Sequence, residues 1–171
     1  MPKRTGVVTF QGDPLTLTGD QVGLRQLAPA FTAIKPDLSS ARLSDYSGKK
    51  LIIASVPSLD TSVCSMETKR FNDEAKNLGD DVELLIISMD LPFAQARWQQ
   101  EHDATEVTLL SDHRSADFGH AYGVLIKELR LLARAVFVVG SDGRIVYDEI
   151  VKEITDQPDY SAVLDAVRSA S

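Results

Sequence analysis

The single cysteine of this 171-residue chain, Cys64, is the residue best suited to covalent chemistry. It ends the segment PSLDTSVC, which also contains Pro57 and Thr61. An apolar run precedes this segment and an amphipathic pattern follows it, so the sequence predicts a strand, a turn, and a helix with Cys64 in its first turn. Unpaired backbone N–H groups and the helix dipole favour a thiolate there. We expect the sulfur to be exposed at this helix tip, where a substrate can approach.

A thiolate in this position suits attack on a peroxide. The pKa of a cysteine falls from about 8.5 to roughly 3.5–7.5 in comparable settings, especially beside a cation. Attack on the terminal oxygen of R–O–O–H also needs hydrogen-bond donors that hold the peroxide in line and stabilise the charge on the leaving oxygen. The hydroxyl of Thr61 and the guanidinium of an arginine suit these roles.

Each candidate residue also has a plainer interpretation. A lone cysteine is often a small buried apolar side chain, and Thr61 could simply cap the helix. Arg134 lies in the apolar stretch LLARAVFVV, read as a strand. A charge is costly there unless it is paired, so an ion pair with a carboxylate is the alternative role of Arg134. Phe93 and Trp98 are expected to pack against apolar neighbours rather than to bind a ligand.

Composition excludes several other classes of function. Apolar residues make up 43% of the chain and charged residues 25%, as in an ordinary soluble domain, and no apolar stretch approaches the roughly 20 residues of a membrane span. The net charge of -7 argues against nucleic-acid binding. The N-terminal segment lacks the apolar run of a secretory signal, so a cytoplasmic protein is expected. One cysteine and the spacing of His102, His113 and His120 predict no internal disulfide, no metal and no cofactor.

The pattern along the chain predicts an α/β fold in a single domain, residues 1–171. Residues 1–20 alternate apolar and polar side chains around a Gly-Asp-Pro turn, which predicts an N-terminal hairpin extension. Further strands are expected at 50–56, 82–90, 107–112 and, as a hairpin, 133–151, with helices at 62–77, 91–102 and 156–171 and a short helix or turn at 115–124. Residues 21–34 are expected to form a loop, with Ser44 capping a short turn and Asp90 capping the second helix. The sum is a mixed sheet with helices on both faces.

The segment PSLDTSVC matches the Pro-x-x-x-Thr-x-x-Cys signature of the peroxiredoxins, and nearly the whole chain resembles their bacterial thiol peroxidase subfamily. The segments that carry the resemblance are TFQGDPLTL, VPSLDTSVCSMETKRFN, SMDLPFAQARW, LLARAVFVV and EITDQPDY. The resemblance implies a thioredoxin-like fold, a homodimer without metal or haem, and activity on hydrogen peroxide and alkyl hydroperoxides. It makes Cys64 the peroxidatic cysteine and Thr61 its hydroxyl partner. It makes Arg134 the activating arginine and Pro57 the shield of the active-site turn.

The chain departs at Gln99 from the subfamily that it resembles. Most members of that subfamily have a second, resolving cysteine at this position. Without it, a sulfenic acid formed at Cys64 cannot condense to a disulfide within one subunit. We therefore expect a one-cysteine cycle, in which an external thiol or a thioredoxin-like protein reduces Cys64 through a mixed disulfide. A longer-lived sulfenic acid also predicts easier inactivation by excess peroxide.

Two other classes of function remain open. A non-enzymatic peroxide sensor or a thioredoxin-fold interaction module would use one oxidation event at Cys64 rather than turnover. A cysteine hydrolase would need a histidine base and an orienting Asn or Asp, and no such set is recognisable. A disulfide reductase is excluded, because its C-x-x-C motif needs two cysteines.

Overall fold

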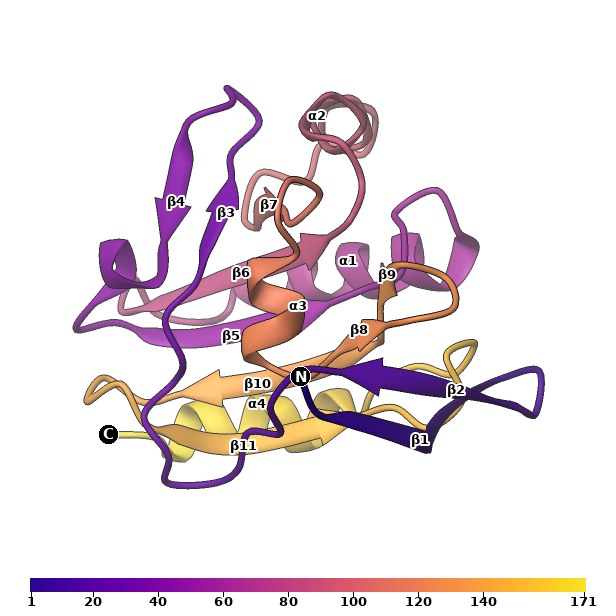
Figure 1. Ribbon diagram of the computed structural model, residues 1–171. Helices are drawn as coiled ribbons and strands as arrows, with labels where there is room; N and C mark the ends of the chain where they lie inside the picture. Colours follow the sequence, from indigo (N-terminus) through magenta and orange to yellow (C-terminus); the bar gives the residue numbers. More distant parts are fainter.

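The computed structural model describes residues 1–171 and contains two β-sheets and four α-helices (Figure 1). In spatial order, the seven-stranded sheet consists of β11 (Ile145–Ile150), β10 (Ala135–Val139), β5 (Lys50–Ser55), β6 (Val82–Ser88), β7 (Thr108–Ser111), β3 (Thr32–Ile34) and β4 (Ser40–Arg42). The four-stranded sheet consists of β1 (Lys3–Phe10), β2 (Asp13–Thr18), β8 (Leu125–Ile126) and β9 (Leu131–Leu132). The helices are α1 (Ser62–Ala75), α2 (Pro92–Glu101), α3 (Asp117–Ala121) and α4 (Tyr160–Ser169), with a 3-10 helix η1 (Leu43–Tyr46).

Strand β5 lies at the centre of the larger sheet, as its uninterrupted apolar sequence predicts. It runs parallel to β6 and antiparallel to β10, and β6 runs parallel to β7, so the sheet is mixed. Successive side chains of β5 point to opposite faces of the sheet, because strand side chains alternate. Leu51 and Ile53 pack in one apolar core, and Ile52 and Ala54 pack in the other. The predicted mixed α/β architecture is therefore confirmed.

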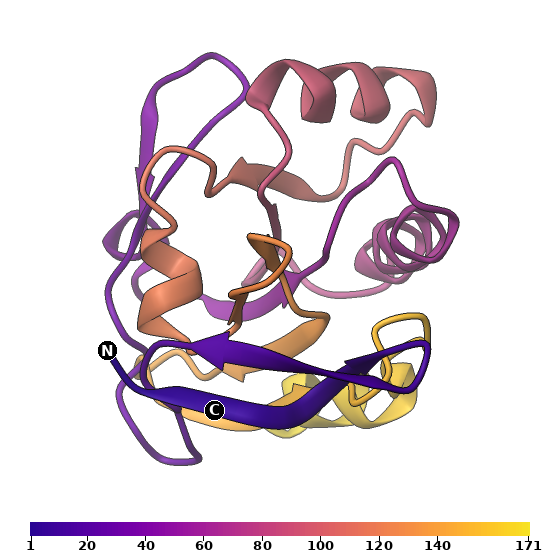
Figure 2. The ribbon, with the colours of Figure 1, turned by 45° about the vertical axis from the view of Figure 1, so that its right-hand side comes forward.

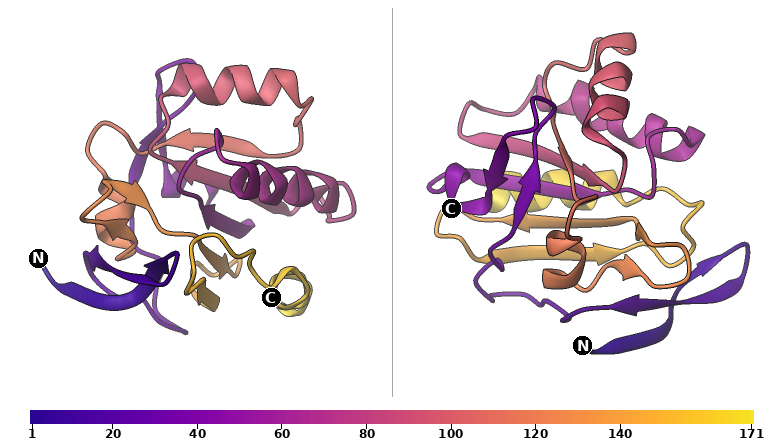
Figure 3. Two further views of the ribbon diagram at one scale, coloured as in Figure 1. Left: turned by 90° about the vertical axis from the view of Figure 1, so that its right-hand side faces the viewer. Right: turned by 45° about the horizontal axis from the view of Figure 1, so that its top comes forward.

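The two faces of the sheet are covered by different layers. Helices α1, α2 and α4 lie on one face, and α3 and the β1–β2 hairpin lie on the other (Figure 3). Figure 2 shows the hairpin below α3, and the backbone N–H of Asp20 joins them by donating to the carbonyl of His120. The face that carries α1 therefore also carries Cys64, which belongs to the same apolar core as Ile52.

The N-terminal hairpin forms as predicted, but its turn lies earlier. Phe10 pairs with Asp13, so Gln11 and Gly12 form the turn, both with positive φ, and Pro14 belongs to β2. The expected loop at residues 21–34 is wrong at its end, because β3 forms there. Strand β3 pairs with the short strand β4 and with β7. A strand of three residues is too short to be recognised from the periodicity of its side chains.

Three local predictions are wrong. Ser44 lies inside η1, whose N-cap is Arg42, and the Asp45 carboxylate accepts a hydrogen bond from the Arg42 N–H. Asp90 does not cap α2: the N-cap is Leu91, and no side chain caps this helix. Arg134 does not lie in a strand but in the two-residue link between β9 and β10. No helix has the length and apolar character needed to cross a membrane.

Candidate active site

The turn between β5 and α1 places Cys64 as predicted. Thr61 is the N-cap of α1 in an extended conformation, and Cys64 is the third residue of the helix. Its backbone N–H is therefore among those at the start of a helix that lack a partner from the preceding turn. The predicted exposure of the sulfur is wrong, because Cys64 is fully buried and packs in the apolar core with Val56 and Phe71. Leu59 of the turn before α1 is buried in the same apolar core.

Arg134 supplies the cation beside the sulfur. Its Nη2 donates to the Cys64 Sγ at 3.3 Å, although the two residues are 70 positions apart. Its Nη2 and Nε also donate to the carbonyl of Ile154, at 2.8 and 3.2 Å, which fixes the guanidinium plane. Burial lowers the pKa of Arg134, but the charges of Glu67 and Cys64 outweigh this effect and raise it. The guanidinium is thus charged, almost fully buried and aimed at the sulfur.

Glu67 is the third side chain of the group formed with Cys64 and Arg134, and sequence reasoning did not find it. Its Oε2 accepts a hydrogen bond from Arg134 Nη1 at 2.6 Å, and its other oxygen is buried without a partner. Burial raises the pKa of Glu67 from its ordinary 4.5 to about 7, although the charge and hydrogen bond of Arg134 act in the opposite direction. The available signal was the spacing, because residues three apart share a helix face and Glu67 follows Cys64 by three. The expected ion pair of Arg134 therefore exists together with its contact to the sulfur.

Thr61 points its hydroxyl back along the turn. The Oγ1 donates to the carbonyl of Ser58 at 2.8 Å and makes no capping bond to α1, so the interpretation of Thr61 as a side-chain helix cap is wrong. Because the hydroxyl proton is already used, its lone pairs remain to accept a hydrogen bond. Pro57 is buried at the start of the same turn. Of the four predicted site residues, Pro57 and Thr61 thus lie on the β5–α1 connection, Cys64 in the first turn of α1 and Arg134 on the link before β10.

The neighbouring helix α2 contributes packing on one side of Cys64. Trp98 is buried and its Nε1 donates to the Ser65 hydroxyl at 3.1 Å, so Trp98 packs as predicted. Phe93 does not pack as predicted, because 65% of its surface is exposed. At the position where the sequence departs from the subfamily that it resembles, the Gln99 amide donates to two main-chain carbonyls beyond the helix, those of Ala104 and Val107.

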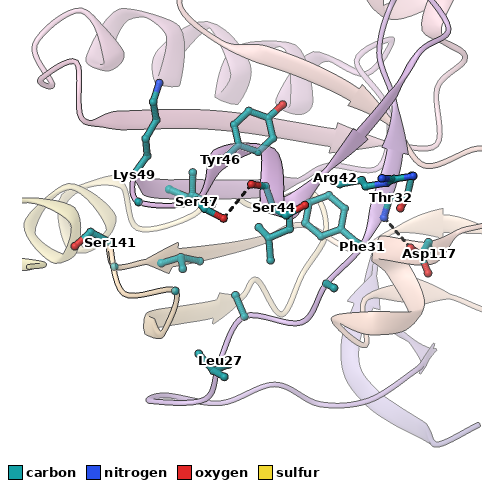
Figure 4. A pocket seen from close by; sticks show the side chains of 18 residues that line it. Leu27, Phe31, Thr32, Arg42, Ser44, Tyr46, Ser47, Lys49, Asp117 and Ser141 are labelled. Carbon is teal, nitrogen blue, oxygen red and sulfur yellow. Dashed lines mark hydrogen bonds between the residues drawn. The ribbon is translucent and has the colours of Figure 1, made fainter.

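A cavity of about 450 Å³ lies away from this cluster, near the opposite end of β5 (Figure 4). Phe31, Tyr46 and Leu51 line it together with Asp117, whose carboxylate accepts a hydrogen bond from the Thr32 N–H. None of the four predicted site residues lines it. No group of three or more His, Cys, Asp or Glu side chains is arranged to hold a metal ion. Cys64, Arg134 and Glu67, which hydrogen bonds join, therefore remain the candidate site, and we call them the active cluster.

Comparison with known proteins identifies the family of this chain. The Redoxin family profile matches residues 22–164. A thiol peroxidase from Oceanobacillus iheyensis is 55% identical over 157 residues, which cover 92% of this chain and 95% of that protein. A thiol peroxidase from Bacillus subtilis is 49% identical over 162 residues, covering 95% and 96%. Among solved structures, a peroxiredoxin-like protein from Aquifex aeolicus is 38% identical, with a TM-score of 0.89 and 96% of both chains covered. The chain belongs to the Redoxin family, and within that family to the thiol peroxidases.

Proposed function

We propose that this protein is a thiol-dependent peroxidase that reduces hydrogen peroxide and organic hydroperoxides, with Cys64 as the nucleophile. The observation that carries the proposal is the 3.3 Å contact between the Arg134 guanidinium and the Cys64 sulfur. A buried cation at this distance stabilises a thiolate, which is the reactive form of cysteine. The names of the thiol peroxidases that are half identical to the chain support the same reaction.

In the first step, the Cys64 thiolate attacks the terminal oxygen of R–O–O–H. The S–O bond forms as the O–O bond breaks, Cys64 becomes a sulfenic acid, and the leaving alkoxide takes up a proton to give the alcohol, or water when R is hydrogen. Arg134 stabilises the charge that develops on the peroxide oxygens. Thr61 accepts a hydrogen bond from the peroxide O–H through its free lone pairs, and Pro57 shields the turn from water. These roles require a peroxide small enough, or a turn mobile enough, to reach the buried sulfur.

Regeneration uses an external thiol, because the chain holds one cysteine. A thiolate attacks the sulfur of the sulfenic acid, releases water and leaves a mixed disulfide. A second thiol then releases the Cys64 thiol and a disulfide of the reductant. A low-molecular-weight thiol or a thioredoxin-like protein is the proposed reductant. A reducing cytoplasm is the compartment that would keep such a reductant and a free cysteine available.

We also propose that the protein functions as a homodimer. Three large apolar side chains near the site are half or more exposed: Met66 at 51%, Leu91 at 51% and Phe93 at 65%. Met66 follows Cys64 on α1, and Leu91 and Phe93 begin α2. Exposed apolar side chains of this size favour burial against a second protein surface. A second copy of the chain would cover them.

Peroxide consumption with several thiol reductants tests this function. We expect many turnovers for the wild type and none for Cys64→Ser, because only the sulfur attacks the peroxide. After treatment with peroxide alone, mass spectrometry should find a sulfenic or sulfinic acid at Cys64 and no disulfide. A wild type that consumes at most one equivalent of peroxide per chain with every reductant is a sensor, and the peroxidase proposal is then wrong.

A further inference from the structure

Asp90, the residue expected to cap α2, instead holds the turn that carries the active cysteine. Its Oδ1 accepts a hydrogen bond from the Ser58 hydroxyl at 2.6 Å. Its Oδ2 accepts one from the Leu59 N–H at 2.8 Å and one from the Ser88 hydroxyl at 2.7 Å. One partly buried carboxylate therefore binds two consecutive residues of the β5–α1 turn.

The carboxylate is itself held by buried groups of other elements. The Ser88 hydroxyl oxygen, besides donating to Asp90, accepts from the Gln95 amide at 3.0 Å. The same amide of Gln95 donates to the carbonyl of Leu110 at 2.8 Å, and the Ser111 hydroxyl donates to the carbonyl of Asp90. The end of β6, helix α2 and strand β7 thus form one hydrogen-bonded support for Asp90. A turn bound to this support has little freedom to move relative to the sheet.

The bonds of Asp90 continue to the groups proposed to act on peroxide. Asp90 holds Ser58 through its hydroxyl, and the carbonyl of Ser58 accepts both the Thr61 hydroxyl at 2.8 Å and the Thr61 N–H at 3.1 Å. Thr61 is the N-cap of α1, three residues before Cys64. The chain of hydrogen bonds therefore runs from Asp90 through Ser58 to Thr61.

We propose that Asp90 is a positioning residue for the peroxidase reaction, which keeps the β5–α1 turn closed with Thr61 and Cys64 in the geometry that receives the peroxide. The proposal rests on the proposed peroxidase function. The carboxylate suits this role because its three partners, the Ser58 hydroxyl, the Leu59 N–H and the Ser88 hydroxyl, are all donors, and a carboxylate only accepts. An amide in its place would turn an NH₂ group towards some of these donors. The turn would then open and expose the buried sulfur.

Asp90→Asn tests the proposal in two single-turnover measurements on the intact protein. The first is the rate of Cys64 oxidation by hydrogen peroxide, which should fall at least about 10-fold, since misplacement by about 1 Å costs up to 100-fold. The second is the rate of Cys64 alkylation by iodoacetamide, which should rise as the sulfur becomes accessible. The ratio of the two rates is the diagnostic quantity, because the two rates change in opposite directions.

Asp112→Asn is the matched control. Asp112 follows β7 as Asp90 follows β6, and its carboxylate accepts from the Phe118 and Gly119 N–H groups at the start of α3 instead of from the β5–α1 turn. Its loss should destabilise the fold and leave the ratio of oxidation to alkylation within about twofold of the wild type. Equal ratios in Asp90→Asn and Asp112→Asn, at matched stability in urea, would overturn the proposal.

Ser58→Ala keeps the test decisive if Asp90→Asn does not fold. This change removes one of the two bonds from the turn and leaves the Leu59 N–H bond, so it should shift the ratio in the same direction by a smaller factor. An unchanged ratio in Ser58→Ala would also overturn the role of Asp90. A wild type that leaves peroxide unreduced contradicts the proposed function instead, and the alkylation rates then still report whether Asp90 closes the turn.

Discussion

The guanidinium of Arg134 is shared between two groups that can each carry a negative charge. It donates to the Cys64 sulfur through Nη2 and to the Glu67 carboxylate through Nη1. A neutral Glu67 leaves the positive charge to the thiolate, whereas an ionised Glu67 competes for it. Because burial raises the pKa of Glu67 to about 7, this competition changes near neutral pH.

The raised pKa of Glu67 predicts a specific dependence of stability on pH. The folded state holds the proton more tightly than the unfolded chain, in which the pKa of Glu67 has its ordinary value of 4.5. The contribution of the Glu67 proton to the stability of the fold is therefore complete below about pH 4.5 and is lost as the pH rises through about 7. Glu67→Gln should remove this part of the pH dependence. Urea unfolding at pH 5 and pH 8 measures this dependence, in a Cys64→Ser background that removes the thiol from the comparison.

The test compares, between two proteins, how far the free energy of unfolding falls from pH 5 to pH 8. The free energy of unfolding should fall more from pH 5 to pH 8 in Cys64→Ser than in the double variant with Glu67→Gln. Asp112, whose pKa burial raises to about 6, contributes equally to both proteins and cancels. Parallel decreases in the two proteins would show that Glu67 is already ionised at pH 5.

Among the elements, α2 carries Gln99, the position at which the resemblance to the thiol peroxidases predicts a second cysteine. Gln99 lies in the last turns of α2 and donates to the carbonyls of Ala104 and Val107 at 2.7 and 3.0 Å. Both of these residues are buried, so their carbonyls have few alternative partners. Gln99 thus fastens the segment that leads from α2 to β7.

Gln99→Ala should destabilise the fold by about 1–3 kcal/mol, because two carbonyls lose their donor in a buried segment. It should leave the rate of Cys64 oxidation by peroxide unchanged, because Gln99 does not contact the active cluster. Gln100→Ala is the control, since Gln100 is exposed on the same helix. Urea unfolding of the two variants checks this, and equal stability of both would contradict the structural role of Gln99.

The periodicity of apolar residues predicted the helices and strands better than it predicted the contacts between them. Strand β5 and helix α1 were predictable because their apolar spacing extends over several residues, and so was the position of Cys64 at their junction. The strands β3, β4, β8 and β9 have only two or three residues, which is too short for a pattern. Asp90 was expected to cap α2 but lies one residue before the N-cap Leu91, and local sequence could not show that its carboxylate turns away from that helix.

At the scale of the whole molecule, the active cluster depends on contacts between residues far apart in the chain. Arg134 lies 67 residues from Glu67 and 70 from Cys64. The parallel pairing of β5 with β6 and the antiparallel pairing of β10 with β5 bring the link before β10 to the end of β5 where α1 begins. Arg134 was predictable from the resemblance of LLARAVFVV, whereas its bonds to Glu67 and Ile154 and the burial of Cys64 depend on the assembled core.

The same assembled core isolates the site from solvent. Cys64 and Glu67 are fully buried and Arg134 nearly so. Electrostatic interactions are stronger in such surroundings than in water, which supports the proposed action of the Arg134 guanidinium on the sulfur. Access of the bulkier reductant to the sulfur then depends on movement of the β5–α1 turn, which Asp90 restrains, whereas hydrogen peroxide reacts in the closed turn.

The most direct measurement of the central claim is the second-order rate constant for oxidation of Cys64 by hydrogen peroxide in the wild type and in Arg134→Lys. Fluorescence of Trp98, which is hydrogen-bonded to Ser65 beside the cysteine, follows the reaction in a stopped-flow instrument. Lysine keeps the charge but lacks the planar fork that reaches sulfur, carboxylate and carbonyl together, so the rate constant should fall at least about 100-fold. Arg130→Lys, an exposed arginine before β9, should react like the wild type. Rate constants for Arg134→Lys and the wild type that agree within about twofold, with both proteins folded, would contradict the claim that this guanidinium activates the sulfur.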